Sequence, residues 1–358
     1  METIAIGKRK IGKGQPTYVV AEIGINHNGR MNLAKQLIKE SAAAGADAVK
    51  FQKRDARSVV VGANLNSHPV GRLSTTVDDI VKGAPAFGGW SYPDTRLELS
   101  EENYRELKRY AAARGVDFIA SPWDEKSTDF LVDLGVPFLK IPGVEITNPS
   151  FLEYAARTRL PLVVSTGTAG IREVDNAVRI IRTYNKNLCL LQCTSAYPSR
   201  PEEIDLRVME TLRRRYRVPV GYSGHEAGIH ISIAAAALNA CIIERHVTLS
   251  REMSGPDHRA SIEMHELKQM VDEIRDVGKA LGSPVKKHYA SENALIKAIG
   301  RSVASTVHIQ KGARITRAML TTKAPSTGIH QSKLHSLIGK RARVAIAPDT
   351  LITKGSIA

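Results

Sequence analysis

The stretch "VPVGYSGHEAGIHISIAAAALNACIIERHVTLS", residues 218–250, holds two short apolar runs on either side of an alanine-rich segment. The runs "VPVGYSG" (218–224) and "CIIERHVT" (241–248) predict buried strands, and "AGIHISIAAAALNA" (227–240) predicts a helix between them. A strand, a helix and a second strand in this order are typical of a parallel sheet. The stretch therefore predicts an α/β fold.

The same alternation runs through most of the chain. Helix-like segments such as "NLAKQLIKESAAAGA" and "EENYRELKRYAAARG" separate further candidate strands. Eight strand–helix units in about 280 residues have the size and rhythm of a (β/α)8 TIM barrel, which we expect over residues 1–282. The six strands predicted before the opening stretch span residues 17–24, 47–53, 117–123, 138–143, 162–167 and 188–194.

The rhythm breaks at two places. Residues 54–99 are too rich in Gly, Pro and Ser for a simple crossover and predict a long loop over the mouth of the second strand. After a linker at 283–297, residues 298–358 predict short strands joined by Lys-Gly and Pro-Asp turns, in a small, mostly β domain. A core of that size is marginal alone, which favours docking on the barrel or on a second subunit.

Composition excludes several classes of protein. No apolar run approaches the roughly 18 to 20 residues that cross a bilayer, and the first residues lack the apolar centre of a signal peptide, so we expect a cytoplasmic protein. Cys189, Cys193 and Cys241 are odd in number and lie in apolar segments, which predicts reduced core cysteines. Redox chemistry and a disulfide framework are therefore not expected.

Positive charge is concentrated at the end of the chain. The net charge is +15, and residues 298–358 hold ten Lys and Arg against a single acid, Asp349. This balance suits either nucleic acid or multiply charged anions. Aromatic residues are only 5% of the chain and do not interleave with the basic ones, so the stacking surface of a single-strand binder is missing. A non-catalytic anion or nucleic-acid binder stays as the alternative from another class.

The predicted strands end in polar groups. In a TIM barrel the carboxyl ends of the strands build the active site, so these groups are the candidates for chemistry. Each can bind an anion, a sugar hydroxyl or a metal: Glu22, Lys50, Gln52, Ser121, Lys140, Ser165, Gln192, Tyr197, Ser223, His225, Glu244, Arg245 and His246.

Two strand-end lysines predict an anion site. A lone lysine here is often a solvated side chain, but Lys50 and Lys140 each sit among large apolar residues, in "AVKFQ" and "FLKIPG". Two buried lysines need a counter-ion, which a phosphate or carboxylate in the barrel mouth would supply. Because burial lowers the pKa of a lysine, Schiff-base chemistry at Lys140 is the competing interpretation.

Two histidines predict a metal site. His225 and His246 end consecutive strands, and neighbouring strands lie about 4.8 Å apart, near enough for two imidazoles to share one ion. A pair of histidines with open positions for water and substrate is what a Lewis-acid metal needs. An isolated histidine would more often be a hydrogen-bonded core residue.

Over nearly its full length the chain resembles the sialic acid synthase family, which joins a TIM barrel to a C-terminal antifreeze-like (SAF) domain. The family makes N-acetylneuraminate and related nonulosonates. The resemblance lies in motifs found in order along the barrel: "AEIGINHNG", "GADAVKFQK", "FLKIPGVEITN", "LVVSTGT", "LQCTSAYP", "GYSGHE", "ERHVTL" and "GPDHRAS".

This resemblance implies a metal-dependent transferase. Phosphoenolpyruvate would condense with N-acetylmannosamine or its 6-phosphate, with release of phosphate by C–O cleavage; synthesis of legionaminic or pseudaminic acid is the alternative within the family. A Schiff-base pyruvate aldolase using Lys140 is a further enzyme alternative. The family also implies a homodimer in which the C-terminal domain of one subunit reaches the active site of the other.

The resemblance also implies roles for individual residues. Catalysis would involve Glu22, Lys50, Lys140 and Tyr197. Phosphoenolpyruvate would be held by Lys50, Ser121, Lys140 and Ser223, and the sugar by Glu22, Gln52, Tyr197 and Asp257. His225 and His246 would bind a divalent metal, Mn²⁺ or Mg²⁺.

Two positions depart from the family pattern. Gly143 and Val144 stand where Ser-Gly is common, which removes a hydroxyl near the predicted anion site. In the small domain Ala324, beside Lys323, stands where many bacterial members have an arginine. Lysine cannot reproduce the two-pronged contact of arginine, so we expect recognition of the sugar to differ.

Overall fold

The computed structural model describes residues 3–59 and 95–358. The chain divides into two compact units, which we call the barrel unit (Met1–Gly282) and the C-terminal unit (Ser283–Ala358). Most of the loop predicted at 54–99 lies outside the described residues; α2 (Ala56–Val59) and η2 (Thr95–Leu97) flank the gap. Among the described helices, none combines the length and apolar character needed to span a membrane.

The barrel unit is built on eight parallel strands in the described part of the chain. They pair in the order β5-β4-β3-β10-β9-β8-β7-β6, and β5 and β6 contact each other, so the sheet is nearly closed. The predicted (β/α)8 barrel is confirmed. The strands are β3 (Tyr18–Gly24), β4 (Ala48–Lys53), β5 (Asp117–Pro122), β6 (Leu139–Ile141), β7 (Leu162–Ser165), β8 (Leu188–Cys193), β9 (Val220–Gly224) and β10 (Ile242–Thr248).

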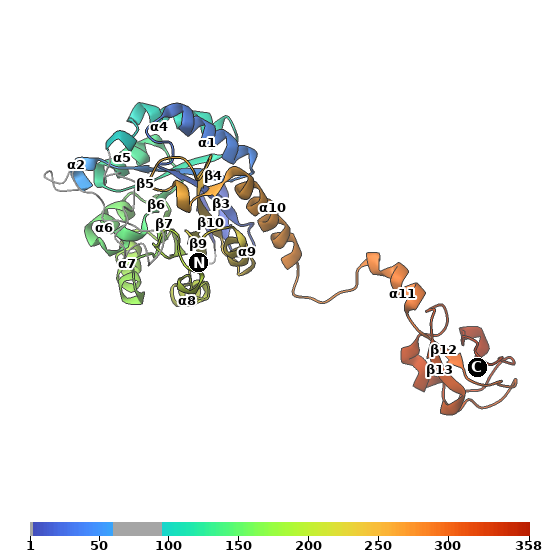
Figure 1. Ribbon diagram of the computed structural model, residues 1–358. Helices are drawn as coiled ribbons and strands as arrows, with labels where there is room; N and C mark the ends of the chain where they lie inside the picture. The colour runs from blue at the N-terminus through green and yellow to red at the C-terminus, as the bar shows by residue number, and fades with distance from the viewer. Residues whose placement is uncertain (1–2, 60–94) are drawn as a thin grey trace. The chain divides into compact units, whose positions relative to one another are not determined.

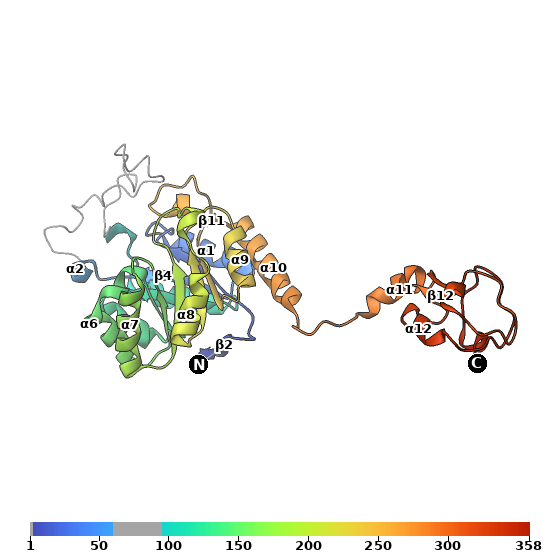
Figure 2. The same ribbon diagram turned by 90° about the horizontal axis from the view of Figure 1, so that it is seen from below.

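Helices surround the strands on the outside (Figure 1, Figure 2). Capping fixes several of them: Ser100 accepts a hydrogen bond from the backbone of Asn103 at the start of α4, and Gly135 ends α5 in the left-handed conformation. The helices are α1 (Met31–Ala43), α4 (Glu101–Ala112), α5 (Glu125–Leu134), α6 (Pro149–Arg157), α7 (Ile171–Tyr184), α8 (Val208–Tyr216), α9 (His230–Ala237) and α10 (Met264–Leu281).

Short elements complete the loops of the barrel unit. The two-residue strand β11 (Ile262–Glu263) lies beside the end of β10 and pairs with it in parallel. The remaining turns are the 3-10 helices η3 (Gly143–Thr147), η4 (Pro201–Glu203) and η5 (His258–Ala260).

A hairpin that sequence patterns did not predict closes the amino end of the barrel. Strands β1 (Thr3–Ile6) and β2 (Arg9–Gly12) are antiparallel. Ile4, Ile6 and Ile11 pack in one buried cluster with interior residues from the beginnings of the barrel strands, such as Tyr18. Because this end is filled by apolar side chains, a binding site has room only at the carboxyl ends of the strands.

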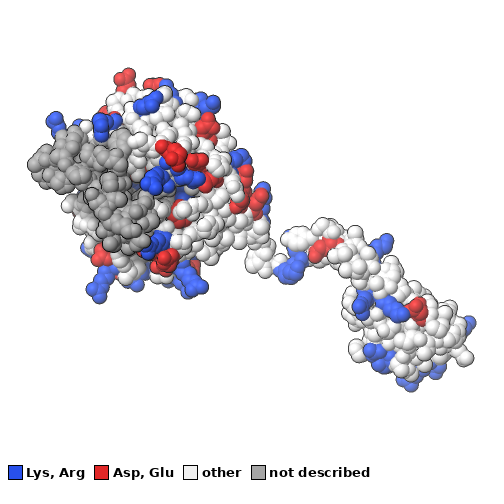
Figure 3. Space-filling model, in the orientation of Figure 1, with Lys and Arg blue, Asp and Glu red and all other residues white. Residues whose placement is uncertain are grey.

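The C-terminal unit is a small domain with its own core. Strands β12 (Ser302–Ser305) and β13 (Leu320–Lys323) are antiparallel, and isolated bridges such as Ile309–Ile346 join the other segments. Its basic side chains are visible in Figure 3. The core comprises Val303, Ile309, Ile315, Leu320, Leu334, Leu337, Ala342, Ile346, Ile352 and Ile357.

The predicted mostly β character of this domain is confirmed, although regular strands are fewer than the sequence suggested. Helix α11 (Asn293–Ile299) begins inside the stretch expected as linker. The other elements are α12 (Leu334–Leu337) and the 3-10 helices η6 (Ala290–Glu292), η7 (Arg317–Met319), η8 (Gln331–Lys333) and η9 (Lys354–Ser356).

Candidate active site

A cavity of about 590 Å³ opens at the carboxyl ends of the barrel strands. Every strand of the barrel contributes at least one side chain to it. The structure brings together all ten residues predicted for the site: Glu22, Lys50, Gln52, Ser121, Lys140, Tyr197, Ser223, His225, His246 and Asp257. Their individual roles stay predictions.

Two buried lysines share one carboxylate in this cavity. The Nζ of Lys140 lies 3.2 Å from Oε1 of Glu244, and the Nζ of Lys50 lies 3.4 Å from the same oxygen. Lys50 also contacts Oε2 of Glu22 at 3.0 Å and donates to Oγ of Ser121 at 3.1 Å. Lys50 is 4% exposed and Lys140 is 3% exposed, so neither lysine is a solvated surface side chain.

Glu244 lies at the centre of these charged contacts. It is one of the strand-end candidates of the sequence, but no specific role was predicted for it. Besides meeting both lysines, its Oε1 accepts a hydrogen bond from Oγ of Ser223 at 3.2 Å. Side chains alternate along a strand, so Glu244 and His246 share the inner face of β10 while Arg245 points outward. That alternation was the signal that could have separated Glu244 from Arg245 among the strand-end residues.

Burial and mutual charge set the protonation of this group. Burial tends to raise the pKa of Glu244, but Lys140 and Lys50 outweigh it and the pKa lies below its usual value. Burial also raises the pKa of Glu22, and Lys50 only partly offsets this. For Lys140, burial lowers the pKa more than Glu244 restores it. Glu22 is therefore the carboxylate of the pair better suited to carry a proton.

The two histidines lie close together, with ring centroids 5.5 Å apart. Nδ1 of His225 is 2.8 Å from the carbonyl oxygen of Thr194; since a carbonyl only accepts, Nδ1 carries the proton and Nε2 keeps its lone pair. Burial lowers the pKa of His225 to about 4 and that of His246 well below its ordinary value. Both imidazoles are therefore neutral near pH 7.

This pair fits a divalent metal. Nδ1 of His246 is buried and has no hydrogen-bond partner among the described residues, and Oδ2 of Asp257 lies 3.7 Å from it. A free nitrogen lone pair on each ring is what a metal ligand requires. Within the described residues no group of three or more His, Cys, Asp or Glu could hold a metal, so His225 and His246 would leave most coordination positions to water and substrate.

A chain of polar contacts positions Glu22. Its Oε1 accepts from Nε2 of Gln52 at 3.1 Å, and Oε1 of Gln52 accepts from Arg54 at 2.8 Å. Gly24 has a φ of +55°, and a Cβ there would stand 3.2 Å from both the Glu22 carboxylate and the Gln52 amide. The glycine is thus required by the conformation and by the space that these two side chains occupy.

The Gly143 departure from the family pattern has a local reason. A Cβ at Gly143 would stand 2.9 Å from the carbonyl oxygen of Gly167, too close for any other residue without movement of the backbone. Nearby Ser165, which also lines the cavity, has a buried Oγ without a hydrogen-bond partner among the described residues. Ser165 was among the strand-end candidates but received no specific role, and its free hydroxyl is placed where a ligand in the cavity could contact it.

The cysteines divide between core and cavity. Cys189 and Cys241 are free and lie in the apolar cluster at the amino end of the barrel, as expected. Cys193 is also free and buried, as expected, and in addition it lines the active-site cavity. The end of β8 turns it inward beside the polar strand ends.

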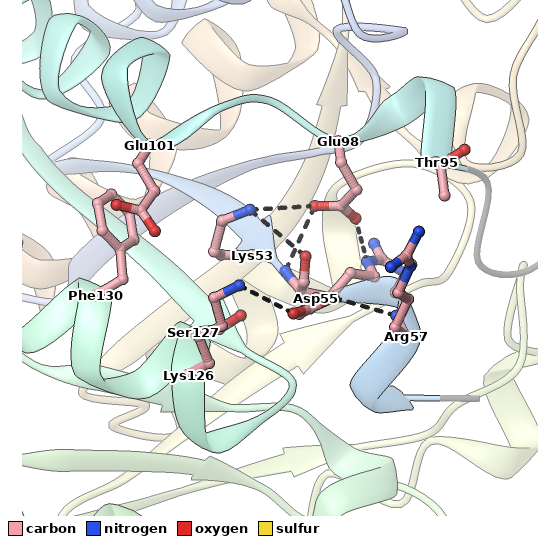
Figure 4. A pocket seen from close by; sticks show the side chains of 11 residues that line it. Lys53, Asp55, Arg57, Thr95, Glu98, Glu101, Lys126, Ser127 and Phe130 are labelled. Atoms are coloured by element: carbon pink, nitrogen blue, oxygen red, sulfur yellow. Dashed lines mark hydrogen bonds and ion pairs between the residues drawn. The ribbon is translucent and has the colours of Figure 1, made fainter. Parts of the chain in front are cut away.

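A second cavity, of about 470 Å³, lies between the end of β4 and helix α5 (Figure 4). Its charges are largely paired: Nε of Arg54 and Oε1 of Glu98 form an ion pair at 2.7 Å, and Lys126 forms one with Asp55 at 3.1 Å. It contains neither the histidine pair nor the lysine pair. The strand-end cavity is therefore the candidate active site.

Comparison with known proteins agrees with this geometry. The NeuB family matches residues 37–286 and the SAF domain matches residues 300–358. The chain is 38% identical to the N,N'-diacetyllegionaminic acid synthase of Campylobacter jejuni, covering 94% of this chain and 98% of that protein. It is also 38% identical to the human N-acetylneuraminate-9-phosphate synthase, covering 96% and 93%.

A solved structure shares the fold. The N-acetylneuraminic acid (sialic acid) synthetase of Leptospira borgpetersenii, crystallised with citrate, superposes with a TM-score of 0.70 at 32% identity, covering 82% of this chain and 95% of that one. With a family match over most of the barrel unit and relatives aligned over nearly the whole chain, the protein belongs to the NeuB family of sialic acid synthases.

Proposed function

We propose that this protein is a metal-dependent transferase that condenses phosphoenolpyruvate with an N-acyl hexosamine to form a nonulosonic acid. C3 of phosphoenolpyruvate would bond to the aldehyde carbon of the open-chain sugar, and the oxygen of one water to C2. The C–O bond to phosphate would then break. Phosphoenolpyruvate, sugar and water thus give the nonulosonate and inorganic phosphate.

One row of side chains supports this reaction most directly. In the sheet register, Glu22 on β3 pairs with Lys50 on β4 and with His246 on β10. An anion held at Lys50 and an aldehyde held near His246 would therefore meet over Glu22. This juxtaposition matches the two substrates of the proposed condensation.

The lysine side of the row suits phosphoenolpyruvate. Lys50 and Lys140 supply two buried positive charges. The hydroxyl of Ser121 lies 3.1 Å from Nζ of Lys50. That of Ser223 lies 3.2 Å from Oε1 of Glu244, the carboxylate that both lysines contact. Phosphate and carboxylate groups gain most from charge-assisted hydrogen bonds in such a buried site. We assign these four residues to phosphoenolpyruvate.

The histidine side suits the sugar. His225 and His246 would hold a divalent metal, Mn²⁺ or Mg²⁺, which when bound would polarise the aldehyde oxygen as a Lewis acid. Gln52 and Asp257 face the same cavity and would bind sugar hydroxyls. We assign Tyr197 to the sugar as well; the centroid of its ring lies 4.0 Å from that of His225.

Glu22 is placed to handle the proton. Burial raises its pKa, and Lys50 offsets this only partly, which makes its carboxyl group better suited than that of Glu244 to accept and return a proton. The contacts from Gln52 and Lys50 hold it in one orientation. We assign to Glu22 the proton transfers that accompany attack on the aldehyde.

The acceptor is proposed as N-acetylmannosamine or its 6-phosphate. Relatives named for N,N'-diacetyllegionaminic acid and for N-acetylneuraminate 9-phosphate are equally similar to the chain, and a pseudaminic acid synthase is 30% identical. Precursors of legionaminic and pseudaminic acid are therefore the alternative acceptors. A panel of these sugars, with the product identified by mass, names the substrate; no product with any of them would contradict the proposal.

One observation favours a second enzyme function. The lowered pKa of Lys140, caused by burial, is a property of lysines that form Schiff bases. Against this, the Lys140 amine is held in an ion pair by Glu244. Borohydride with pyruvate or phosphoenolpyruvate should leave the protein unmodified; a trapped adduct at Lys140 would favour the aldolase.

We also propose a homodimer in which the C-terminal unit of one subunit completes the site of the other. Leu295, Ile296 and Ile299 on α11 are exposed apolar side chains that a partner would cover. Lys323, next to Ala324 at the end of β13, forms an ion pair with Asp349. Its positive charge is therefore already paired within its own subunit. A chain ending at Gly282 should fold and bind phosphoenolpyruvate but lose turnover. Full activity of that chain would contradict the proposal.

A further inference from the structure

A fully buried ion pair lies on the outer face of the two strands that carry the histidines. Nη1 of Arg245 is 2.8 Å from Oε1 of Glu226, and both side chains are 1% exposed. Glu226 directly follows His225, and Arg245 directly precedes His246. The pair therefore joins the two neighbours of the predicted metal ligands.

The pair is held by more than one contact. Nη2 of Arg245 donates to the backbone carbonyl of Glu226 at 2.6 Å. The guanidinium therefore hydrogen-bonds both the side chain and the main chain of that residue. Oε2 of Glu226 accepts from the hydroxyl of Tyr222 at 2.7 Å, and its Oε1 accepts from Ser232 at 2.9 Å. Ser232 belongs to α9, which packs over these strands.

The strand ladder alone does not position His225. Pairing between β9 and β10 ends at Gly224 and Arg245, one residue before the histidines. Beyond that point the backbone carbonyl of His225 accepts a hydrogen bond from the amide of Ser199 at 3.1 Å, and its Nδ1 faces the carbonyl of Thr194. On the β10 side it is held, through Glu226, by Arg245. Toward β10, where the pairing of β9 has ended, the Arg245–Glu226 contacts are therefore the link between the two histidine-bearing segments.

Gly224 makes room for this arrangement. A Cβ at this position would stand 2.4 Å from Oε2 of Glu226 and 2.5 Å from the ring of Tyr222. No side chain is compatible with Glu226 folded back against its own strand. The glycine before His225 is therefore required by the ion pair.

We infer that the Arg245–Glu226 pair is a positioning device that sets the spacing of His225 and His246 for a shared divalent cation. This inference rests on the metal site of the proposed function. The pair acts from the outer face of the barrel, where it touches neither substrate nor metal. Groups that orient metal ligands typically change metal affinity by about 10- to 100-fold when they are removed.

Stability alone does not account for the pair. Buried ion pairs can often be replaced by apolar residues of similar size without loss of stability, because removing two charges from water is costly. Arg245 also keeps a buried Nε without a hydrogen-bond partner among the described residues, which is a cost in itself. A positioning role separates from a stabilising one when both charges are removed together.

The test is the double variant Glu226→Leu/Arg245→Met of the full chain. Mn²⁺ binding is titrated by the loss of the EPR signal of the free ion, and phosphoenolpyruvate binding is measured separately without metal. We expect Mn²⁺ affinity to fall about tenfold or more. Phosphoenolpyruvate affinity should stay within about twofold, because Lys50 and Lys140 contact neither residue. Excess Mn²⁺ should restore turnover.

The matched control removes an ion pair from the outer helices. Asp175 on α7 and Arg215 on α8 contact each other at 2.6 Å, away from the histidines. The double variant Asp175→Leu/Arg215→Met should bind Mn²⁺ like the wild type. If the first double variant does not fold, Glu226→Gln keeps the shape of the side chain and should show a smaller loss of Mn²⁺ affinity in the same direction.

Two results would overturn the inference in different ways. A folded Glu226→Leu/Arg245→Met protein with wild-type Mn²⁺ affinity would remove the positioning role and leave the metal site standing. A wild-type protein that binds no Mn²⁺, or binds it equally well as His225→Ala, would remove the metal site and the positioning role together.

Discussion

Lys140 and Glu244 form an ion pair of 3.2 Å at the carboxyl end of the barrel, with both side chains no more than 7% exposed. Removing one partner of such a pair leaves the other charge buried without compensation. Because Lys50 reaches the same carboxylate oxygen, Glu244 balances two lysines at once. Its removal should change both stability and anion binding.

Glu244→Gln should lower the free energy of unfolding by about 3–5 kcal/mol, measured in urea without phosphate. Phosphoenolpyruvate should then raise the melting temperature of this variant more than that of the wild type, because the ligand replaces the missing charge. Glu153→Gln, which breaks an exposed pair with Arg157, should leave the free energy of unfolding nearly unchanged. Equal stabilisation of the variant and the wild type by phosphoenolpyruvate would refute the role of Glu244.

Lys50→Met should raise the Kd for phosphoenolpyruvate by about 10- to 100-fold, since hydrogen bonds to charged groups contribute about 1.5–3 kcal/mol. Calorimetry without metal measures this directly. Lys126→Met removes a lysine that is 71% exposed on α5 and should leave the Kd unchanged. If both variants bind alike, Lys50 does not hold the substrate.

Asp257→Asn should stabilise the metal-free protein above pH 6. Burial, and secondly the charge of Glu22, raises the pKa of Asp257 to about 6 from 3.8. Ionisation of Asp257 therefore costs the folded state nothing below pH 3.8 and reaches its full cost above about 6. The gain should grow over this window to on the order of 3 kcal/mol.

Urea unfolding of the wild type and Asp257→Asn in EDTA, at pH values from 4 to 8, checks this prediction. The difference in stability between them should rise with pH through about 6. A difference that does not change with pH would mean that Asp257 has an ordinary pKa in the folded protein.

Gly24→Ala should reduce turnover, because the new methyl group would press on the Glu22 carboxylate and the Gln52 amide. Gly14→Ala is the matched control: it also has positive φ, +73°, but no atom lies within 4 Å of its Cβ position. Both variants should lose about 1–2 kcal/mol of stability from the backbone conformation. Loss of turnover confined to Gly24→Ala supports the positioning of Glu22; equal turnover of the two variants contradicts it.

Much of the barrel could be predicted from the sequence. Strands of a parallel sheet are buried on both faces, so they appear as short, continuous apolar runs such as "LVVS" in β7. Polar residues at the carboxyl ends of such runs lie at the mouth of the barrel. That rule alone predicted that five residues share one site: Glu22, Lys50, Lys140, His225 and His246.

The remaining features depend on contacts that local patterns do not encode. The β1–β2 hairpin has four-residue strands with charged residues between its isoleucines, and its partners lie throughout the barrel interior. Glu244 and Arg245 are adjacent in sequence, yet one faces the cavity and the other an outer ion pair. Alternation along the strand places them on opposite faces, and the packing of β10 against its neighbours shows which face lines the cavity.

The central claim is tested most directly with phosphoenolpyruvate labelled with ¹⁸O at the oxygen that bridges C2 and phosphorus. With Mn²⁺ and the acceptor sugar, the account predicts that the label appears in the released phosphate, since the C–O bond breaks. Release should require the sugar and should fail in His225→Ala. Label retained in the organic product, or release without the sugar, would contradict the account.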